Sequence, residues 1–128
     1  MELENECARK VAAEGYQVLQ NPTRQQVAEA RSNTGDTGNT DKNPDFLIEG
    51  HVFDCYAPNP TKAVRGVWTE VSRKVGKGQT QRVAINLEDW EGDVAALRKQ
   101  FDDWPVPRLK ELIVVPRSGA IIQIVKQD

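Results

Sequence analysis

The sequence predicts one domain, residues 1–128, of the mixed α/β (α+β) class. Its expected core has the order αβββαβ and carries a C-terminal α-β-β extension. Short apolar runs bounded by turn residues alternate with amphipathic stretches of helical period. A length of 128 residues suits one domain with its own core, and 38% hydrophobic and 28% charged residues are typical of a globular chain. The apolar runs are too short to span a bilayer, and no signal-peptide pattern opens the chain.

The first part of the chain is expected to form a helix, a short strand and a β-hairpin. Apolar residues recur at helical spacing until Gly15, which is placed to end the helix. A turn at Gly50 joins the two hairpin strands. The expected ranges are 2–14 for the helix, 16–19 for the strand, and 45–49 and 51–56 for the hairpin.

The segment of about residues 23–43 is rich in turn-forming residues and poor in apolar ones. A short helical turn is expected at 24–30. The rest is expected to be a flexible loop too polar to pack.

The second part of the chain alternates helices with apolar strands. A stripe that includes Val67 and Val71 predicts an amphipathic helix, and glycines follow it. The expected ranges are 61–77 and 92–103 for helices, 82–87, 111–116 and 120–125 for strands, and 104–107 for a linker.

Charge is unevenly distributed along the chain, although the net charge is only −2. Residues 1–60 have a balance of −5, residues 61–87 a balance of +5, and residues 88–103 a balance of −4. The basic segment is either a solvated helix face or a cationic strip that holds a phosphate backbone.

Three acidic residues are candidates for a metal site. Glu4 lies within about 30° of the centre of the apolar face of the first helix, and Asp45 starts a hairpin strand. Asp54 lies mid-strand on the face that it shares with Val52 and Tyr56. Two aspartates on adjoining strands can converge, and such oxygens suit Mg²⁺. The alternatives are a helix-end acid for Glu4, a turn or capping residue for Asp45, and a solvent-facing residue on an edge strand for Asp54.

Lys74 borders the apolar stripe of the basic helix. Its side chain either reaches from the core side to water or points at the carboxylates and stabilises charge on a phosphate. His51 is the single histidine, which excludes a two-histidine ribonuclease mechanism. A metal-independent ribonuclease relying on His51 stays open as an alternative. Cys7 and Cys55 lack metal-binding spacing and are expected to be reduced.

The run KNPDFLIEGHVFDCYAP at 42–58 resembles the C-terminal tRNase toxin domains of contact-dependent growth inhibition proteins (CdiA). It is similar also to the C-terminal toxin of the wall-associated protein WapA. The segments ENECA at 4–8, GYQV at 15–18 and QNP at 20–22 look like the start of those domains. KVGKGQ at 74–79 and RVAINL at 82–87 extend the resemblance, so that it covers nearly the whole chain except 23–41.

This resemblance implies a PD-(D/E)xK-like nuclease core, in which Glu4, Asp45 and Asp54 are catalytic and hold Mg²⁺ (or Mn²⁺). Glu6 competes with Glu4 for the role of the acid on the first helix. The usual lysine two residues after Asp54 is absent because Tyr56 stands there. Lys74 is the matching candidate from the following helix, with Lys77 behind it. The residues expected to hold the RNA backbone are Lys42, Lys62, Arg65, Lys77 and Arg82.

The implied function is that of a toxin domain, a metal-dependent endoribonuclease that cleaves tRNA and inhibits the growth of neighbouring bacteria. The implied partners are tRNA and a cognate immunity protein, and the domain is otherwise expected to be monomeric. It would be exported within a larger surface effector and act in the cytoplasm of the target cell. The alternatives are a DNase on the same core and a non-catalytic interaction module.

Overall fold

The computed structural model describes residues 2–35, 46–77, 80–116 and 120–125, with the backbone alone for residues 2–6. No helix in these ranges is both long and apolar enough to cross a membrane. The elements, in chain order, are α1 (Glu2–Ala13), β1 (Val18–Gln20), α2 (Arg24–Thr34), β2 (Phe46–Ile48), β3 (His51–Tyr56), α3 (Val64–Gly76), β4 (Arg82–Asn86), α4 (Val94–Asp103), β5 (Glu111–Val115) and β6 (Ile122–Val125).

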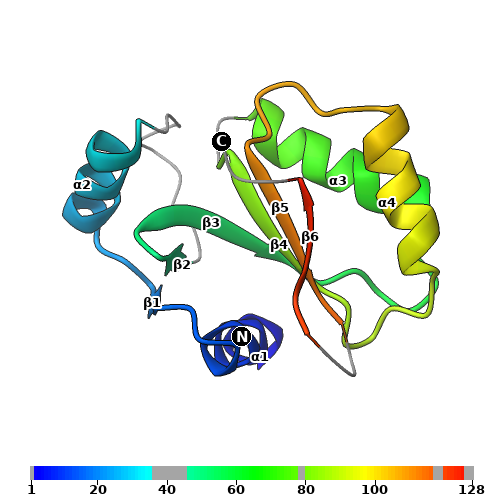
Figure 1. Cartoon of the computed structure of the whole chain (residues 1–128), viewed down its shortest axis with the longest axis horizontal. Helices are drawn as coiled ribbons and strands as arrows, with labels where there is room; N and C mark the ends of the chain where they lie inside the picture. Colours follow the sequence, from blue (N-terminus) through cyan, green and yellow to red (C-terminus); the bar gives the residue numbers. More distant parts are fainter. Residues whose placement is uncertain (1, 36–45, 78–79, 117–119, 126–128) are drawn as a thin grey trace.

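The strands form one six-stranded mixed sheet whose order in space, β1-β2-β3-β4-β5-β6, repeats the order in the chain (Figure 1). β1, β2 and β3 are antiparallel, β3, β4 and β5 are parallel, and β6 returns antiparallel to β5. The parallel pairs are connected through α3 and α4, as parallel strands require a crossover. The predicted mixed fold class is confirmed, and the predicted order of elements holds except for the insertion of α2.

The predicted hairpin at Gly50 is confirmed. Phe46 pairs with Phe53 and Ile48 with His51, so only Glu49 and Gly50 form the loop. Both loop residues have positive φ, 50° and 79°, the left-handed conformation that a tight two-residue hairpin needs.

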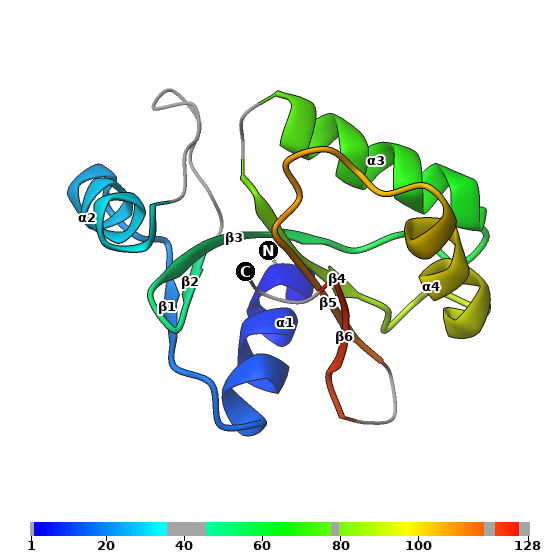
Figure 2. The ribbon, with the colours of Figure 1, turned by 45° about the horizontal axis from the view of Figure 1, so that its top comes forward.

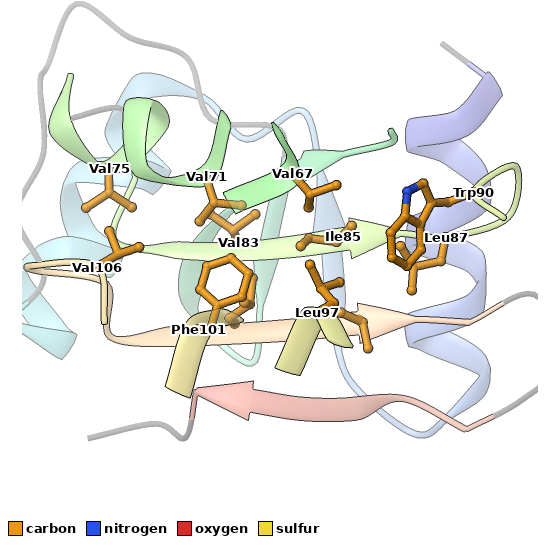
Figure 3. Close-up of a cluster of buried hydrophobic side chains, with 12 residues drawn as sticks. Val67, Val71, Val75, Val83, Ile85, Leu87, Trp90, Leu97, Phe101 and Val106 are labelled. Atoms are coloured by element: carbon orange, nitrogen blue, oxygen red, sulfur yellow. The ribbon is translucent and has the colours of Figure 1, made fainter. Parts of the chain in front are cut away.

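The two faces of the sheet are covered by different helices. Cys7 and Val11 of α1 pack with Phe53 of β3 on one face. Val67 and Val71 of α3 pack with β4, β5 and α4 on the other face, in the largest core cluster (Figure 3). Figure 2 shows α1 on one side of the strands, with α3 and α4 on the opposite side.

The short helical turn expected at 24–30 is confirmed but is longer than predicted, because α2 continues to Thr34, and the expectation of a loop is therefore wrong for residues 31–34. Thr23 and Gln26 make a capping box: the Thr23 hydroxyl accepts from the Gln26 amide, and the Gln26 side chain accepts from the Thr23 amide. Val27 and Ala30 pack on Leu47 and Val52 of the hairpin. The packing of α2 on the hairpin therefore stabilises the helix, and α2 contributes only two small apolar residues to it. Two such residues are a weak indication of a helix in the sequence.

Gly92→Ala is expected to destabilise the fold by about 1–3 kcal/mol, because overpacking displaces core side chains. A Cβ at Gly92 would lie 2.1 Å from Cζ2 of Trp90, a core residue whose Nε1–H donates to the carbonyl of Lys62 at 2.7 Å. Urea unfolding monitored by tryptophan fluorescence measures the change.

The matched control is Gly76→Ala at the end of α3, where a Cβ meets no atom within 4 Å. This variant is expected to be neutral or stabilised by up to about 1 kcal/mol, because alanine favours helix. Equal unfolding midpoints for the two variants would contradict the packing argument.

Candidate functional site

Asp54 is a fully buried carboxylate, 0% exposed, in the middle of β3. The side chains of β3 alternate as predicted: Phe53 faces α1, whereas Val52 packs against α2 and Tyr56 packs beside the α3 core. Asp54 therefore lies on the face that α2 and α3 share, between the positions where these two helices touch β3. A buried carboxylate is costly unless it is paired, hydrogen-bonded or bound to a metal.

A group of charged side chains gathers around Glu70 on α3, near Tyr56 of β3. The Glu70 carboxylate accepts a hydrogen bond from Nη2 of Arg73. This hydrogen bond, followed by the charges of Arg73, Lys62 and Lys74, lowers the pKa of Glu70, although slight burial opposes the shift. We call Lys62, Glu70, Arg73 and Lys74 the α3 cluster. Three cations face one carboxylate, so the cluster retains positive charge that can attract a phosphate.

Tyr56 occupies the position two residues after Asp54, on the same face of β3. Burial raises the pKa of its phenol, and the charge of Glu70 adds to the effect, while Arg73 opposes it. The phenol is therefore protonated at neutral pH. It can donate a hydrogen bond to an oxygen but cannot supply the charge of a lysine.

Lys62 is held at the start of α3 by two contacts. Its carbonyl accepts from Trp90, and its side chain passes over Gly66, where a Cβ would lie 2.9 Å from Lys62 Cε. The glycine leaves space for the lysine stem beside the helix. The ammonium of Lys62 is thus directed along α3 toward the Glu70 carboxylate, with which it interacts electrostatically.

The other residues predicted for RNA binding have different positions. Lys74 is half-buried on α3, while Arg65 on α3 and Lys77 just after its end are exposed. Arg82 is only 1% exposed, and its Nη1 lies 2.6 Å from Oε1 of Glu111. The prediction that Arg82 holds RNA is corrected, because a buried, paired guanidinium does not reach a phosphate backbone.

Several predicted site residues lie outside what the structure describes. Lys42 and Asp45 fall in the undescribed range 36–45, and only the backbone is described at Glu4 and Glu6. His51 is described: strand alternation places it on the face of β3 opposite that of Asp54. The structure thus brings Asp54 to the same face of the sheet as Lys74 and does not bring His51 there.

Among the side chains that are described, no three His, Cys, Asp or Glu residues gather in a way that could hold a metal ion. The Asp54 carboxylate, on the face of the sheet that α2 and α3 share, is of the chemical type that binds a hard cation such as Mg²⁺.

Two members of the α3 cluster, Glu70 and Arg73, were not predicted as site residues. Their spacing of three residues reads as an ordinary surface ion pair of a helix. The signal that was available is the concentration of basic residues over 61–87, in which Glu70 is the single acid.

The sequence and the fold are similar to those of known proteins. Residues 42–121 match the family model described as the contact-dependent growth inhibition CdiA C-terminal domain. Over 118 residues, 92% of this chain, the sequence is 38% identical to the tRNA nuclease CdiA-2 of Burkholderia pseudomallei (strain 1026b). The chain spans 3% of the length of that protein.

A solved structure is also similar to this fold. It is the CdiA-CT/CdiI toxin and immunity complex from Burkholderia pseudomallei, with a TM-score of 0.78 and 36% sequence identity. The match covers 96% of this chain and 82% of that chain. The family model accounts for well over half of the sequence, and the chain therefore belongs to the family of CdiA C-terminal domains of contact-dependent growth inhibition proteins.

Proposed function

We propose that this chain is a toxin domain that cleaves tRNA. The observation that carries the proposal is the position of Asp54, a buried carboxylate on the same sheet face as the basic α3 cluster. A carboxylate able to bind a cation and neighbouring cations able to hold a phosphate are the elements that phosphodiester cleavage needs. The name of the Burkholderia relative, tRNA nuclease, supports RNA as the substrate rather than DNA.

We propose that Asp54 binds Mg²⁺ (or Mn²⁺) together with Asp45 and Glu4, with Glu6 as the competing acid on α1. When bound, the metal ion supplies charge neutralisation at the phosphate and lowers the pKa of a coordinated water. Asp54 contributes a carboxylate from the middle of β3, where Asp54 pairs with Val83 of β4. The protonated phenol of Tyr56 can donate a hydrogen bond to an oxygen near this carboxylate, and Lys74 supplies the positive charge that Tyr56 lacks.

The RNA backbone is proposed to run along α3. Lys62 and Lys74 lie in the α3 cluster, and Arg65 and Lys77 extend the positive charge along the same helix and beyond its end. Lys42 is proposed as a further contact. These side chains contact phosphates and so contribute affinity without reading sequence.

We propose that the domain is neutralised by a cognate immunity protein, supported by the toxin and immunity complex that this chain resembles. Apart from that complex the domain is proposed to be monomeric. The family supports delivery as part of a longer exported protein, and the proposed site of action is the cytoplasm of the recipient cell.

The test is incubation of the purified chain with total bacterial tRNA and, separately, with plasmid DNA, each with Mg²⁺ and with excess chelator. We expect discrete tRNA fragments with Mg²⁺, intact tRNA with chelator and intact plasmid throughout. Cleavage that survives the chelator would reject the metal proposal, and cleavage of plasmid alone would reject tRNA as the substrate.

Lys74→Ala is expected to lower the rate of tRNA cleavage about a hundredfold, because a preorganised charge near a reacting phosphate contributes that much. Lys77→Ala is expected to lower it less than about fivefold, since an exposed lysine contributes one screened phosphate contact. Single-turnover cleavage at saturating enzyme separates this effect from weaker binding. A larger loss of rate in Lys77→Ala than in Lys74→Ala would assign the stabilisation of the reacting phosphate to Lys77 instead.

A further inference from the structure

A pocket of about 320 Å³ lies between α2 and the edge of the sheet formed by β1 and β2, and the function proposed above does not use it. Leu19 and Leu47 contribute apolar surface to its lining, while Glu29 and Glu49 contribute carboxylates. The amide side chains of Gln26 and Asn33 also line it. Its size and mixed lining suit a small ligand held by a few polar groups.

Glu49 holds the left-handed conformation that the two-residue hairpin needs, although glutamate rarely adopts it. Glu49 has φ of +50° in the two-residue loop, a position where asparagine or glycine is favoured. Glu49 keeps this conformation although its residue type is not favoured there, and its side chain also lines a pocket. Residues held in such unfavourable backbone conformations concentrate at functional sites.

Leu19 adds a second observation of the same kind. Its side chain is 41% exposed, one of three large hydrophobic side chains described as exposed, and it borders the same pocket. An apolar surface left open to water beside polar hydrogen-bonding groups is what a flat ring covers when it binds.

The pocket lies on the same side of the sheet as Asp54. Leu47, which lines the pocket, pairs with Val52, and Asp54 follows Val52 by two residues on the same face of β3. Two residues of strand correspond to about 7 Å. Asp54 therefore lies between the pocket at α2 and the α3 cluster, so that a single RNA strand can contact both.

The pocket and the α3 cluster carry opposite charges, which are complementary to different parts of a nucleotide. Glu29 and Glu49 repel phosphate and accept hydrogen bonds from N–H groups, whereas the cations of the α3 cluster attract phosphate. Guanine is the base whose Watson–Crick edge presents adjacent N–H donors, N1–H and the N2 amino group. The Gln26 oxygen accepts from the Thr23 amide at 2.8 Å, which leaves its amide N–H groups to donate to a base oxygen.

We propose that this pocket binds an unpaired guanine base of the RNA substrate, with Glu29 and Glu49 accepting from its N1–H and N2 amino groups. The base so held determines which phosphodiester is presented at Asp54. This inference rests on the proposed nuclease function. Six of the nine lining residues precede residue 42, where the match to the family model begins, so the pocket lies largely outside the segment that defines the family.

The test is titration of the ¹⁵N-labelled chain with guanosine, followed by NMR, with adenosine, cytidine, uridine and methylguanidinium as comparisons. We expect saturable shifts of the amides of Leu19, Asn33 and Gly50 with guanosine, at least about tenfold tighter than with any comparison ligand. Glu29→Gln and Glu49→Gln are expected to weaken guanosine binding about tenfold or more. Glu91→Gln, at an exposed glutamate elsewhere on the chain, is the matched control and is expected to bind unchanged.

Glu49→Asn separates a binding role from a structural one. Asparagine prefers the left-handed conformation of this turn, so the variant is expected to raise the melting temperature by about 3 °C. The same variant is expected to lose guanosine binding. A residue that merely shapes the turn would instead give higher stability with unchanged binding, and that result would overturn the proposal.

Two further results overturn the guanine site. One is the absence of saturable shifts with guanosine, and the other is tighter binding of methylguanidinium, which would assign the pocket to a basic side chain of a protein partner. Parallel assays of RNA cleavage keep the two proposals distinct. Cleavage without guanosine binding would reject the guanine-binding pocket and leave the proposed nuclease function standing. Guanosine binding without cleavage would support the guanine-binding pocket and reject the proposed nuclease function.

Discussion

Asp54→Asn is expected to lower the rate of tRNA cleavage by at least about a hundredfold while leaving the fold intact. The substitution keeps the size of a side chain that is 0% exposed, so no cavity is created. It removes the negative charge that is proposed to hold the metal ion, and charge stabilisation of this kind contributes factors of about 10²–10³. The measurement is the single-turnover rate of tRNA cleavage across a Mg²⁺ series, with circular dichroism of each variant.

Asp89→Asn provides the control, because Asp89 is exposed in the segment after β4 and lies outside the α3 cluster. Its rate is expected to match the wild type at every Mg²⁺ concentration. If Asp54→Asn cleaves tRNA within tenfold of the wild type, Asp54 has no part in the chemistry. Its burial would then be a feature of folding alone.

Arg82→Ala is expected to destabilise the fold by about 3–5 kcal/mol, the effect of breaking a buried ion pair and leaving one charge uncompensated. Arg82 and Glu111 lie opposite each other on the parallel strands β4 and β5, and Glu111 also accepts from Nε2 of Gln123 at 2.8 Å. The ion pair thus links the centre of the sheet to its edge strand β6. Urea unfolding gives the change directly, and domains of this size have about 5–15 kcal/mol in total.

Arg65→Ala is the matched control, because Arg65 is exposed on α3. It is expected to change stability by less than about 0.5 kcal/mol and to weaken RNA binding. The double variant Arg82→Met with Glu111→Leu is expected to recover most of the lost stability, since apolar residues can replace a buried pair. A stable Arg82→Ala protein that binds RNA weakly would restore Arg82 to the RNA surface.

Local patterns were sufficient to predict most of the fold. The hairpin at Gly50, the helix of the basic segment and the buried strands were predictable because each combines a regular apolar period with clear turn residues. α2 was predicted only as a short turn, because its apolar stripe consists of Val27 and Ala30 and its partners on the hairpin are brought near only by folding. The capping box of Thr23 and Gln26 was the available signal.

The site was predictable only in part. Strand alternation placed Asp54 on the correct face, since that inference needs nothing beyond the period of a β-strand. Arg82 was misassigned because a basic residue at the start of a strand looks exposed until the register of β4 and β5 places Glu111 opposite it. That register is a long-range property, which neither segment shows by itself.

The sheet adds its strands in the order in which the chain supplies them, from β1 to β6. Each new strand joins the one made immediately before it, and the two parallel pairs, β3–β4 and β4–β5, each wait only for the one helix that connects them. Folds in which contacting segments are near each other along the chain close shorter loops and fold faster than interleaved topologies. A domain proposed to act after transfer into another cell benefits from this property. It can regain its structure step by step, and few unpaired strand edges are exposed to aggregation meanwhile.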